Sequence, residues 1–183
     1  RDSARMLCGL QKNGSGTVLW AGKPMSRRLR RKKAYMVMQD VGHQLFTDSV
    51  AAECALGIKT PNKDEIDRTL EKVDLLAYKE RHPLSLSGGQ MQRLAVVVSD
   101  ICGKDLLVFD EPTSGLDLKS MEEVGTLTRS LATQGKVLLI ITHDIEFMMQ
   151  ICTRILFIRD GEIVEDLSGG QKEKIVRLLR GEE

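Results

Sequence analysis

Apolar and polar residues alternate along the chain in two patterns, one typical of buried strands and one typical of amphipathic helices. Short aliphatic runs bounded by charged or turn-forming residues predict strands that are buried on both faces. Apolar residues spaced three or four apart predict helices. The strands expected from these runs are Thr17–Trp20, Ala34–Met38, Leu106–Phe109 and Val137–Ile141, followed by a hairpin over Ile155–Val164.

Helical patterns fill the intervals between these strands. Asn62 and Ser87 each precede such a pattern and are expected to cap it. The helices expected from the pattern are the end of one at Ala4–Leu10, then Asp48–Leu56, a helix after Asn62, a helix from Ser87 to Ile101, Lys119–Thr133, and a short amphipathic helix over Gln171–Arg180. Strands that alternate with helices predict an α/β fold with a mainly parallel sheet.

Composition changes this picture little. The chain has 183 residues, enough for one domain with a core, and its 27 basic and 26 acidic residues leave a net charge of +1. This balance, with only 4% aromatic residues, gives no reason to expect nucleic acid as a partner. The longest aliphatic run, Val137–Ile141, is too short to cross a bilayer, so any work at a membrane requires a partner.

The four cysteines lie far apart and form no CxxC pair, which argues against a zinc knuckle or a redox motif. Each sits among apolar residues, so we expect buried thiols in a reducing compartment. The residues are Cys8, Cys54, Cys102 and Cys152.

Two carboxylates, Asp110 and Glu111, end the apolar strand Leu106–Phe109. The carboxyl ends of parallel strands form the ligand-binding edge of an open α/β sheet. One carboxylate there could hold Mg²⁺ and the other could polarise an attacking water. The alternative is a strand followed by an acidic helix cap.

A second signal is the sequence Leu86-Ser87-Gly88-Gly89-Gln90 at a predicted helix start. Glycines let the backbone approach a phosphate closely, and a helix N-terminus adds unpaired N–H groups. Asp110 follows Gln90 by 20 residues, room for one helix and one strand. A second LSGGQ, Leu167–Gln171, has only 12 residues after it, so we expect an ordinary helix start there.

Further polar residues follow strands that end at the same edge. Gln39 follows Ala34–Met38, and His143 follows Val137–Ile141 at a place where a γ-phosphate could lie. Ser114–Asp117 forms a tight loop just after the two carboxylates.

Taken in order, these motifs resemble the ABC ATPase family over residues 4–161. Gln39 matches the Q-loop, Leu86–Gln90 the signature, Leu106–Glu111 the Walker B strand, Ser114–Asp117 the D-loop and His143 the switch histidine. The sequence Val37–Phe46 further resembles the ATPase subunits of energy-coupling-factor importers. The implied fold is a partial P-loop NTPase core, residues 1–40 and 101–165, with an inserted helical signature subdomain, residues 41–100, and a C-terminal helix, residues 166–183.

The resemblance also implies roles. Asp110 and Gln39 would bind Mg²⁺, and Glu111, His143 and Gln39 would be catalytic. ATP would lie between two ATPase domains packed head to tail. The residues expected to face the nucleotide held by the opposite domain are Ser87, Gly88, Gly89, Gln90 and Asp117. A transmembrane transporter subunit is the other expected partner, which would place the protein at the cytoplasmic face of the cell membrane.

The chain departs from the family at its start. No GxxxxGK followed by Ser or Thr is present, and Arg1, Asp2 and Ser3 stand where the end of that loop would fall. We therefore expect a truncated or decayed domain that is inactive alone. The alternative function is a catalytically incomplete module that lends its signature to a partner ATPase. An ABC protein that acts on DNA or ribosomes is a third, less favoured reading.

Three smaller features complete the expectations. Arg27–Lys33 holds six basic residues in seven, either a solvated helical face or a phosphate- or membrane-binding patch. Asp100 falls at a usually apolar position, where an unpaired buried carboxylate would be costly. In the segment Gln39–Val50, the apolar Leu45, Phe46 and Val50 form either a docking surface for a membrane partner or part of the helical core.

Overall fold

The computed structural model describes residues 2–12, 15–168 and 170–180. It divides the chain into two compact units, the first ending at Ile141 and the second beginning at Thr142. The first unit contains a three-stranded parallel sheet in the order β3-β4-β5, together with the helices that cover it. Its strands are β3 (Ala34–Val37), β4 (Leu106–Asp110) and β5 (Val137–Ile141), and a small antiparallel pair consists of β1 (Leu19–Trp20) and β2 (Lys23–Pro24).

The central strand β4 is the most buried part of the sheet. Leu107, Val108 and Phe109 are fully buried, which confirms the expectation that this apolar run is covered on both faces. The expectation was wrong for β5, whose residues are only partly buried and whose first residue, Val137, is 50% exposed. β5 pairs with β4 on one side and has no second neighbour in the described three-stranded sheet, so part of it faces solvent.

Six helices and three 3-10 turns complete the first unit within its described residues. They are α1 (Asp2–Leu7), α2 (Arg27–Lys33), η1 (Val41–His43), α3 (Val50–Ala55), α4 (Lys63–Glu71), η2 (Leu76–Tyr78), η3 (Pro83–Ser85), α5 (Gly88–Ile101) and α6 (Leu118–Thr133). Ser49, Asn62 and Ser87 each cap a helix by accepting a backbone N–H, as their positions predicted. Of the predicted strand Thr17–Trp20, only Leu19–Trp20 is a strand.

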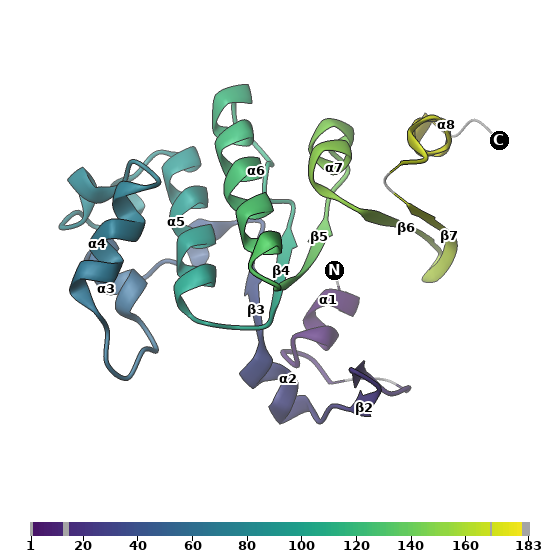
Figure 1. The fold of residues 1–183 in the computed structure, drawn as a ribbon, viewed down its shortest axis with the longest axis horizontal. Helices are drawn as coiled ribbons and strands as arrows, with labels where there is room; N and C mark the ends of the chain where they lie inside the picture. The colour runs from purple at the N-terminus through teal and green to yellow at the C-terminus, as the bar shows by residue number, and fades with distance from the viewer. Residues whose placement is uncertain (1, 13–14, 169, 181–183) are drawn as a thin grey trace. The chain divides into compact units, whose positions relative to one another are not determined.

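The two faces of the sheet are covered by different helices. Ala4 and Cys8, in and just after α1, pack against Met36 of β3 and Val108 of β4 on one face. On the other side α5 packs against β3 and lies beside α6 (Figure 1). Helices α3 and α4 pack in turn against α5 and share one apolar core with it.

The helical core shows which apolar residues of the segment Gln39–Val50 are buried and which are at the surface. Leu45 (2% exposed) and Val50 (0% exposed) are buried in it, so they are core residues and do not form a docking surface. Phe46 is 69% exposed and stands alone as a large apolar side chain at the surface of this segment.

The second unit consists of α7 (Ile145–Ile151), β6 (Arg154–Arg159), β7 (Glu162–Ser168) and α8 (Lys172–Arg180). β6 and β7 pair antiparallel, as the Asp160-Gly161 turn predicted. Both turn residues have positive φ, +52° and +84°, which suits Asp-Gly. The small core of this unit is formed by Met148, Ile155, Leu167 and Ile175.

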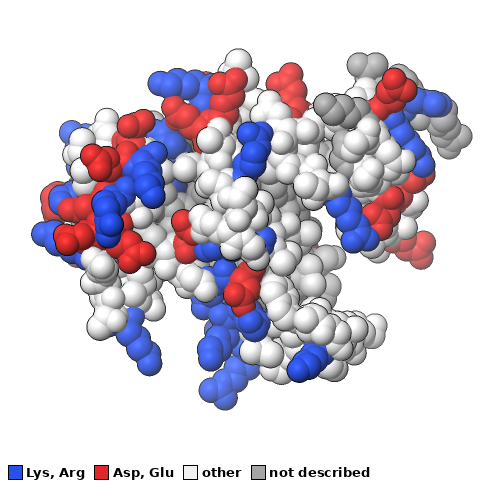
Figure 2. Space-filling view, in the orientation of Figure 1, with Lys and Arg blue, Asp and Glu red and all other residues white. Residues whose placement is uncertain are grey.

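The basic segment of α2 is partly structural. The guanidinium of Arg27 donates to the carbonyls of Gly9 (2.8 Å) and Leu10 (3.1 Å), and Lys33 forms an ion pair with Asp105. Arg30 is buried at 3% exposure, which corrects the view of the segment as uniformly solvated. The remaining cations are exposed, and Figure 2 shows Lys and Arg side chains gathered where α2 lies.

Asp100 is not the unpaired buried carboxylate that the sequence suggested. It is partly exposed and forms an ion pair with Lys136 at 2.9 Å.

The four cysteines differ in burial. Burial raises the pKa of the Cys8 thiol to about 11 and that of Cys54 to about 12, which keeps both protonated and unreactive. Cys102 and Cys152 are only partly buried, so the expectation that all four thiols are buried holds for two of them.

We expect Phe109→Ala to lower the free energy of unfolding by about 3–5 kcal/mol, because it empties a fully buried site in the central strand. Phe46→Ala is the matched control and should change the unfolding free energy by less than about 0.5 kcal/mol, because its ring is exposed. Urea denaturation of both variants measures the two values. Comparable losses would show that Phe46 is part of the core.

Candidate functional site

Asp110 and Glu111 lie at the carboxyl edge of the sheet. Asp110 is the last residue of β4 and lies opposite Ile141 of β5. The backbone N–H of Glu111 donates to the carbonyl of Ile141 at 2.8 Å, so the chain stays attached to β5 one residue beyond the strand. Both residues are nearly buried, at 7% and 9% exposure. Two carboxylates therefore lie side by side in the sequence at the nearly buried carboxyl end of β4.

The backbone reverses direction at Glu111. Its φ is +51°, a left-handed conformation that is uncommon for a residue with a side chain. The N–H of Ser114 donates to the Glu111 carbonyl at 3.1 Å, which closes the turn. Strained backbone of this kind is concentrated at functional sites, where the surrounding structure holds it.

Gln39 comes to the same edge from β3. Val37, the last residue of β3, lies opposite Phe109, so Gln39 extends just past the level of Asp110. Its side chain is exposed, and its Nε2 donates to Ser114 Oγ at 3.5 Å. The parallel register thus brings Gln39 against the loop that follows the carboxylates, although the two are 75 residues apart in sequence.

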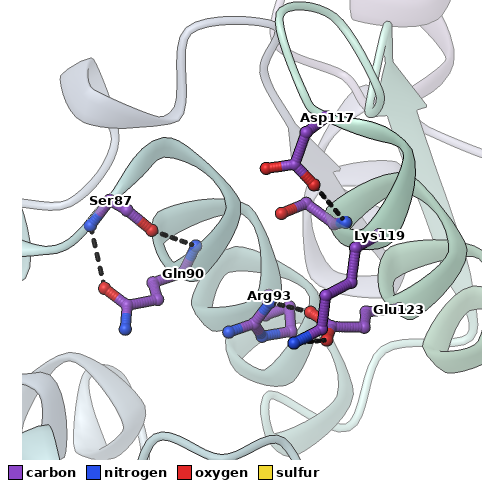
Figure 3. A network of polar contacts seen from close by, with 7 residues as sticks. Ser87, Gln90, Arg93, Asp117, Lys119 and Glu123 are labelled. Atoms are coloured by element: carbon purple, nitrogen blue, oxygen red, sulfur yellow. Dashed lines mark hydrogen bonds and ion pairs between the residues drawn. The ribbon is translucent and has the colours of Figure 1, made fainter.

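The signature residues Leu86–Gln90 form the start of α5. Ser87 Oγ accepts the Gln90 N–H at 3.3 Å, while Gln90 Oε1 accepts the Ser87 N–H at 2.9 Å (Figure 3). This reciprocal capping box fixes the turn. Gly88 is exposed, and a Cβ placed on it would meet nothing within 4 Å, so the backbone here is open to a ligand.

Gly89 serves a different purpose from Gly88. It is buried, and a Cβ placed on it would lie 2.4 Å from Ser120 Oγ and 2.8 Å from Ser120 Cβ. Glycine at this position therefore allows the N-terminal ends of α5 and α6 to approach closely.

Asp117 caps the neighbouring helix α6. Its Oδ1 accepts the N–H of Ser120 at 2.8 Å (Figure 3). That hydrogen bond lowers the pKa of the Asp117 carboxyl, so the residue is ionised at neutral pH. The carboxylate is exposed and stands on the helix that packs against the signature helix.

An ion-pair network ties the two helices together below these ends. Arg93 of α5 donates to Glu123 of α6, and Lys119 lies 3.8 Å from the same carboxylate (Figure 3). The Arg93 side chain is only 12% exposed, so this pair is better shielded than a surface salt bridge. Sequence reasoning missed it, because the partners are 30 residues apart on different helices and no spacing signals the contact.

His143 and the second LSGGQ both belong to the second unit. His143 is exposed and comes directly before Asp144, which caps α7 through the N–H of Phe147 at 3.0 Å. In the second motif Gly169 lies outside the described residues. Ser168 ends β7 and its N–H donates to Gln171 Oε1 at 3.1 Å, just before α8 begins, which is consistent with an ordinary helix start.

The structure therefore gathers the expected site residues into two groups within the first unit. Gln39, Asp110 and Glu111 share the sheet edge with Ser114, while the signature and Asp117 share the paired starts of α5 and α6. His143 belongs to the other unit.

The sheet edge offers the kind of ligands that Mg²⁺ accepts. Asp110 supplies a carboxylate and Gln39 an amide oxygen. Mg²⁺ in nucleotide sites typically binds one or two protein oxygens, and phosphate and water oxygens fill its other positions. Among the described residues, no three His, Cys, Asp or Glu side chains form a metal cage of their own. The donor set fits a metal that arrives with a nucleotide.

A parallel sheet with two carboxylates at its carboxyl edge, covered by a helix with a glycine-rich start, is an α/β arrangement typical of proteins that bind phosphates. Residues 3–114 match the family model described as ABC transporter. The chain therefore belongs to the ABC transporter family, as an ATP-binding domain.

A curated relative supports this assignment, and two solved structures share the fold. A putative ABC transporter ATP-binding protein from Treponema denticola is 58% identical over 176 residues, 96% of this chain and 36% of the relative. The structure of cbiO1 from Clostridium perfringens, part of the ABC transporter complex cbiONQ, superposes with a TM-score of 0.81 at 26% identity over 98% of this chain and 76% of that one. A bacterial Atm1-family ABC exporter with ATP bound shares the fold, with a TM-score of 0.81 at 22% identity over 98% of this chain and 33% of that one.

The Treponema denticola relative is much longer than the matched region. This chain spans about a third of it, since the alignment covers 36% of the relative's length. None of the helices in the described part of this chain is both long enough and apolar enough to cross a membrane.

We expect Gly89→Ala to lower the free energy of unfolding by about 1–3 kcal/mol, because rotation of Ser120 can move its Oγ but not its Cβ, so α5 and α6 must separate. Gly88→Ala is the matched control and should change it by less than about 0.5 kcal/mol. Thermal or urea unfolding measures both. Placing Gly89→Ala on a Ser120→Gly background should recover part of the loss, and equal effects of the two glycine substitutions would refute this packing.

Proposed function

We propose that this chain is the nucleotide-handling part of an ATP-hydrolysing subunit that powers import through a membrane transporter. The observation that carries the proposal is the sheltered pair Asp110–Glu111 at the sheet edge, with the Gln39 amide 3.5 Å from Ser114 in the adjoining loop. Family membership supports ATP as the nucleotide and Mg²⁺ as its usual metal.

Each residue at the edge has a distinct chemical task in this proposal. Asp110, with the Gln39 amide oxygen, would hold Mg²⁺, which neutralises phosphate charge when bound. Glu111 would accept the proton of the attacking water. Its left-handed backbone turns the residue out of the strand direction, and its N–H bond to Ile141 holds it there.

The signature would act on the nucleotide of an opposite ATPase domain, arranged head to tail. Support comes from the exposed backbone at Gly88 and from the N-terminus of α5, whose N–H groups and dipole favour a phosphate. Ser87 and Gln90 fix that turn through their capping box, while Gly89 and Asp117 set the position of the two helix ends.

A transmembrane subunit would be the other partner, and the protein would lie at the cytoplasmic face of the cell membrane. Phe46 supports this, because it is a large exposed apolar side chain only seven residues beyond Gln39. The likeness to cbiO1, part of a transporter complex, supports an energy-coupling-factor type of importer. The near-zero net charge gives nucleic acid no electrostatic advantage as a partner.

Residues 1–183 contain no GxxxxGK loop, which in P-loop proteins supplies most of the contacts to the phosphates. We expect a polypeptide of these residues alone to bind Mg-ATP weakly or not at all. Titration calorimetry measures the affinity. A dissociation constant in the micromolar range would contradict this expectation and show that the phosphates are held in another way.

In a version of the protein that carries a phosphate-binding loop, Glu111→Gln should keep ATP binding and lower turnover about 10²–10⁴-fold, because the general base is lost. Glu71→Gln, an exposed carboxylate on α4, is the control and should leave turnover unchanged. Steady-state phosphate release measures turnover. A normal rate in Glu111→Gln would remove Glu111 from the role of base.

His143→Ala should also slow turnover in that same version of the protein, if His143 contacts the γ-phosphate. The measurement is the same phosphate-release assay, with ATP binding followed separately. A rate equal to that of the unsubstituted protein would assign His143 a structural place at the start of α7.

A further inference from the structure

We infer that Arg93 and Glu123 are positioning residues for ATP hydrolysis in the opposite domain, because their ion pair sets the position of the signature relative to Asp117. The inference rests on the proposed function, since it takes the signature to act on the nucleotide that another ATPase domain holds. It depends on two layers of contacts between α5 and α6, one at the helix ends and one a turn further along.

The first layer is the contact between Gly89 and Ser120, which lie in the first turns of α5 and α6. A Cβ placed on Gly89 would lie 2.8 Å from the Ser120 Cβ. The N–H of Ser120 donates to Asp117, the cap of α6, at 2.8 Å. Closely packed atoms resist further approach strongly but resist separation only weakly. This layer therefore limits how near the two helix ends can come, and a second contact is needed to hold them there.

The second layer is the ion pair. Arg93 lies four residues after Gly89 on α5, and residues at this spacing share a helix face. The Nη1 atom of Arg93 is 4.0 Å from a Cβ placed on Gly89, which confirms that the two are on one face. Glu123 lies three residues after Ser120 on α6 and accepts a hydrogen bond from Arg93 (Figure 3). Attraction in this layer, together with close contact in the first, fixes the angle between the helices.

On one side the ion pair borders open space. A cavity of about 420 Å³ lies beside it, lined by Arg93, Glu123 and Leu127 among other residues of α5, α6 and the segment after α4. Packing on this side therefore leaves room for the helices to shift. A partly shielded ion pair often adds little net stability, because the cost of desolvation offsets the attraction. The effect expected of this pair is to select one arrangement of the helices.

That arrangement matters for the signature because phosphate recognition by a helix start depends on direction. The first N–H groups of α5 point along the helix axis, and the exposed backbone at Gly88 leaves them open to a ligand. A tilt of α5 would move these groups relative to Asp117. A displacement of about 1 Å from a productive geometry can lower a rate about 100-fold. Loss of the pair should therefore slow hydrolysis at the site that this signature completes.

A matched control pair lies at the other end of α5. Asp100 pairs with Lys136 at 2.9 Å, and their side chains are 31% and 13% exposed. The corresponding values for Glu123 and Arg93 are 32% and 12%. The two pairs are thus equally shielded, but Asp100 is ten residues beyond Gln90 and far along the helix from the signature. Breaking the control pair should cost stability without moving the helix start.

The first test measures turnover and melting temperature in a version of the protein that carries a phosphate-binding loop. Arg93→Met should lower the melting temperature no more than Lys136→Met does, because Lys119 remains 3.8 Å from Glu123. Only Arg93→Met should lower turnover, by about tenfold or more. Arg93→Lys keeps a cation for Glu123 and should retain most of the turnover. Unchanged turnover in Arg93→Met, or an equal loss in Lys136→Met, would overturn the inference.

The second test shows in which domain Arg93 acts. Protein carrying Arg93→Met is mixed with protein carrying Glu111→Gln, so that one site of the mixed dimer combines an intact Glu111 with an intact signature. Hydrolysis by the mixture should exceed the sum of the two variants measured separately. A rate no greater than that sum would mean that Arg93 acts within its own domain, which contradicts the inference. Glu123→Gln replaces Arg93→Met in both tests should the latter fail to fold.

A variant that damages the signature directly separates this inference from the function on which it rests. Gly88→Asp, mixed with Glu111→Gln in the same way, tests the shared site alone. Recovery in that mixture without recovery in the Arg93→Met mixture would overturn the inference and leave the head-to-tail arrangement standing. No recovery in either mixture would overturn both.

Discussion

The parallel register of the buried strand β4 between β3 and β5 is the constraint on which the rest of the structure depends. Because Val37 lies opposite Phe109 and Asp110 opposite Ile141, three chain segments end at one level of the sheet. Gln39 and Glu111, which follow β3 and β4, therefore lie at the same edge although they are far apart in the sequence. A slip of one residue would exchange the two faces of β4, whose side chains fill different parts of the core, so packing specifies this register.

Two sets of contacts hold the segments that leave this edge. One runs through α6, whose cap Asp117 lies beside the signature because Gly89 permits close packing and Arg93 pairs with Glu123. The other holds the segment after β3, where Gln44 accepts the N–H of Met38 and Glu53 accepts those of Phe46 and Thr47. Both include buried or half-buried polar contacts. Breaking such a contact costs more free energy than breaking an exposed ion pair.

The sequence predicted what local patterns can encode. A pattern of a few residues was enough to predict three features, and the structure confirmed each of them. They are the buried strand β4, the helix cap at Ser87 and the Asp160-Gly161 turn. Periodicity could not distinguish β5, which is partly exposed, from a strand buried on both faces. Contacts between distant residues left no local signal. The pair Arg93–Glu123, the pairing of Asp100 with Lys136, and the bonds from Gln44 to β3 required the fold itself. The roles of the site residues stay predictions.

The most direct measurement of the central claim, that one nucleotide site combines the sheet edge of one domain with the signature of another, uses two inactive variants of the active protein. One carries Gly88→Asp and keeps Glu111, while the other carries Glu111→Gln and keeps Gly88. In a mixed head-to-tail dimer, one site has both residues intact and the other has neither. ATP hydrolysis by the mixture should therefore rise well above the sum of the two variants measured separately. A rate no greater than that sum would contradict a shared site.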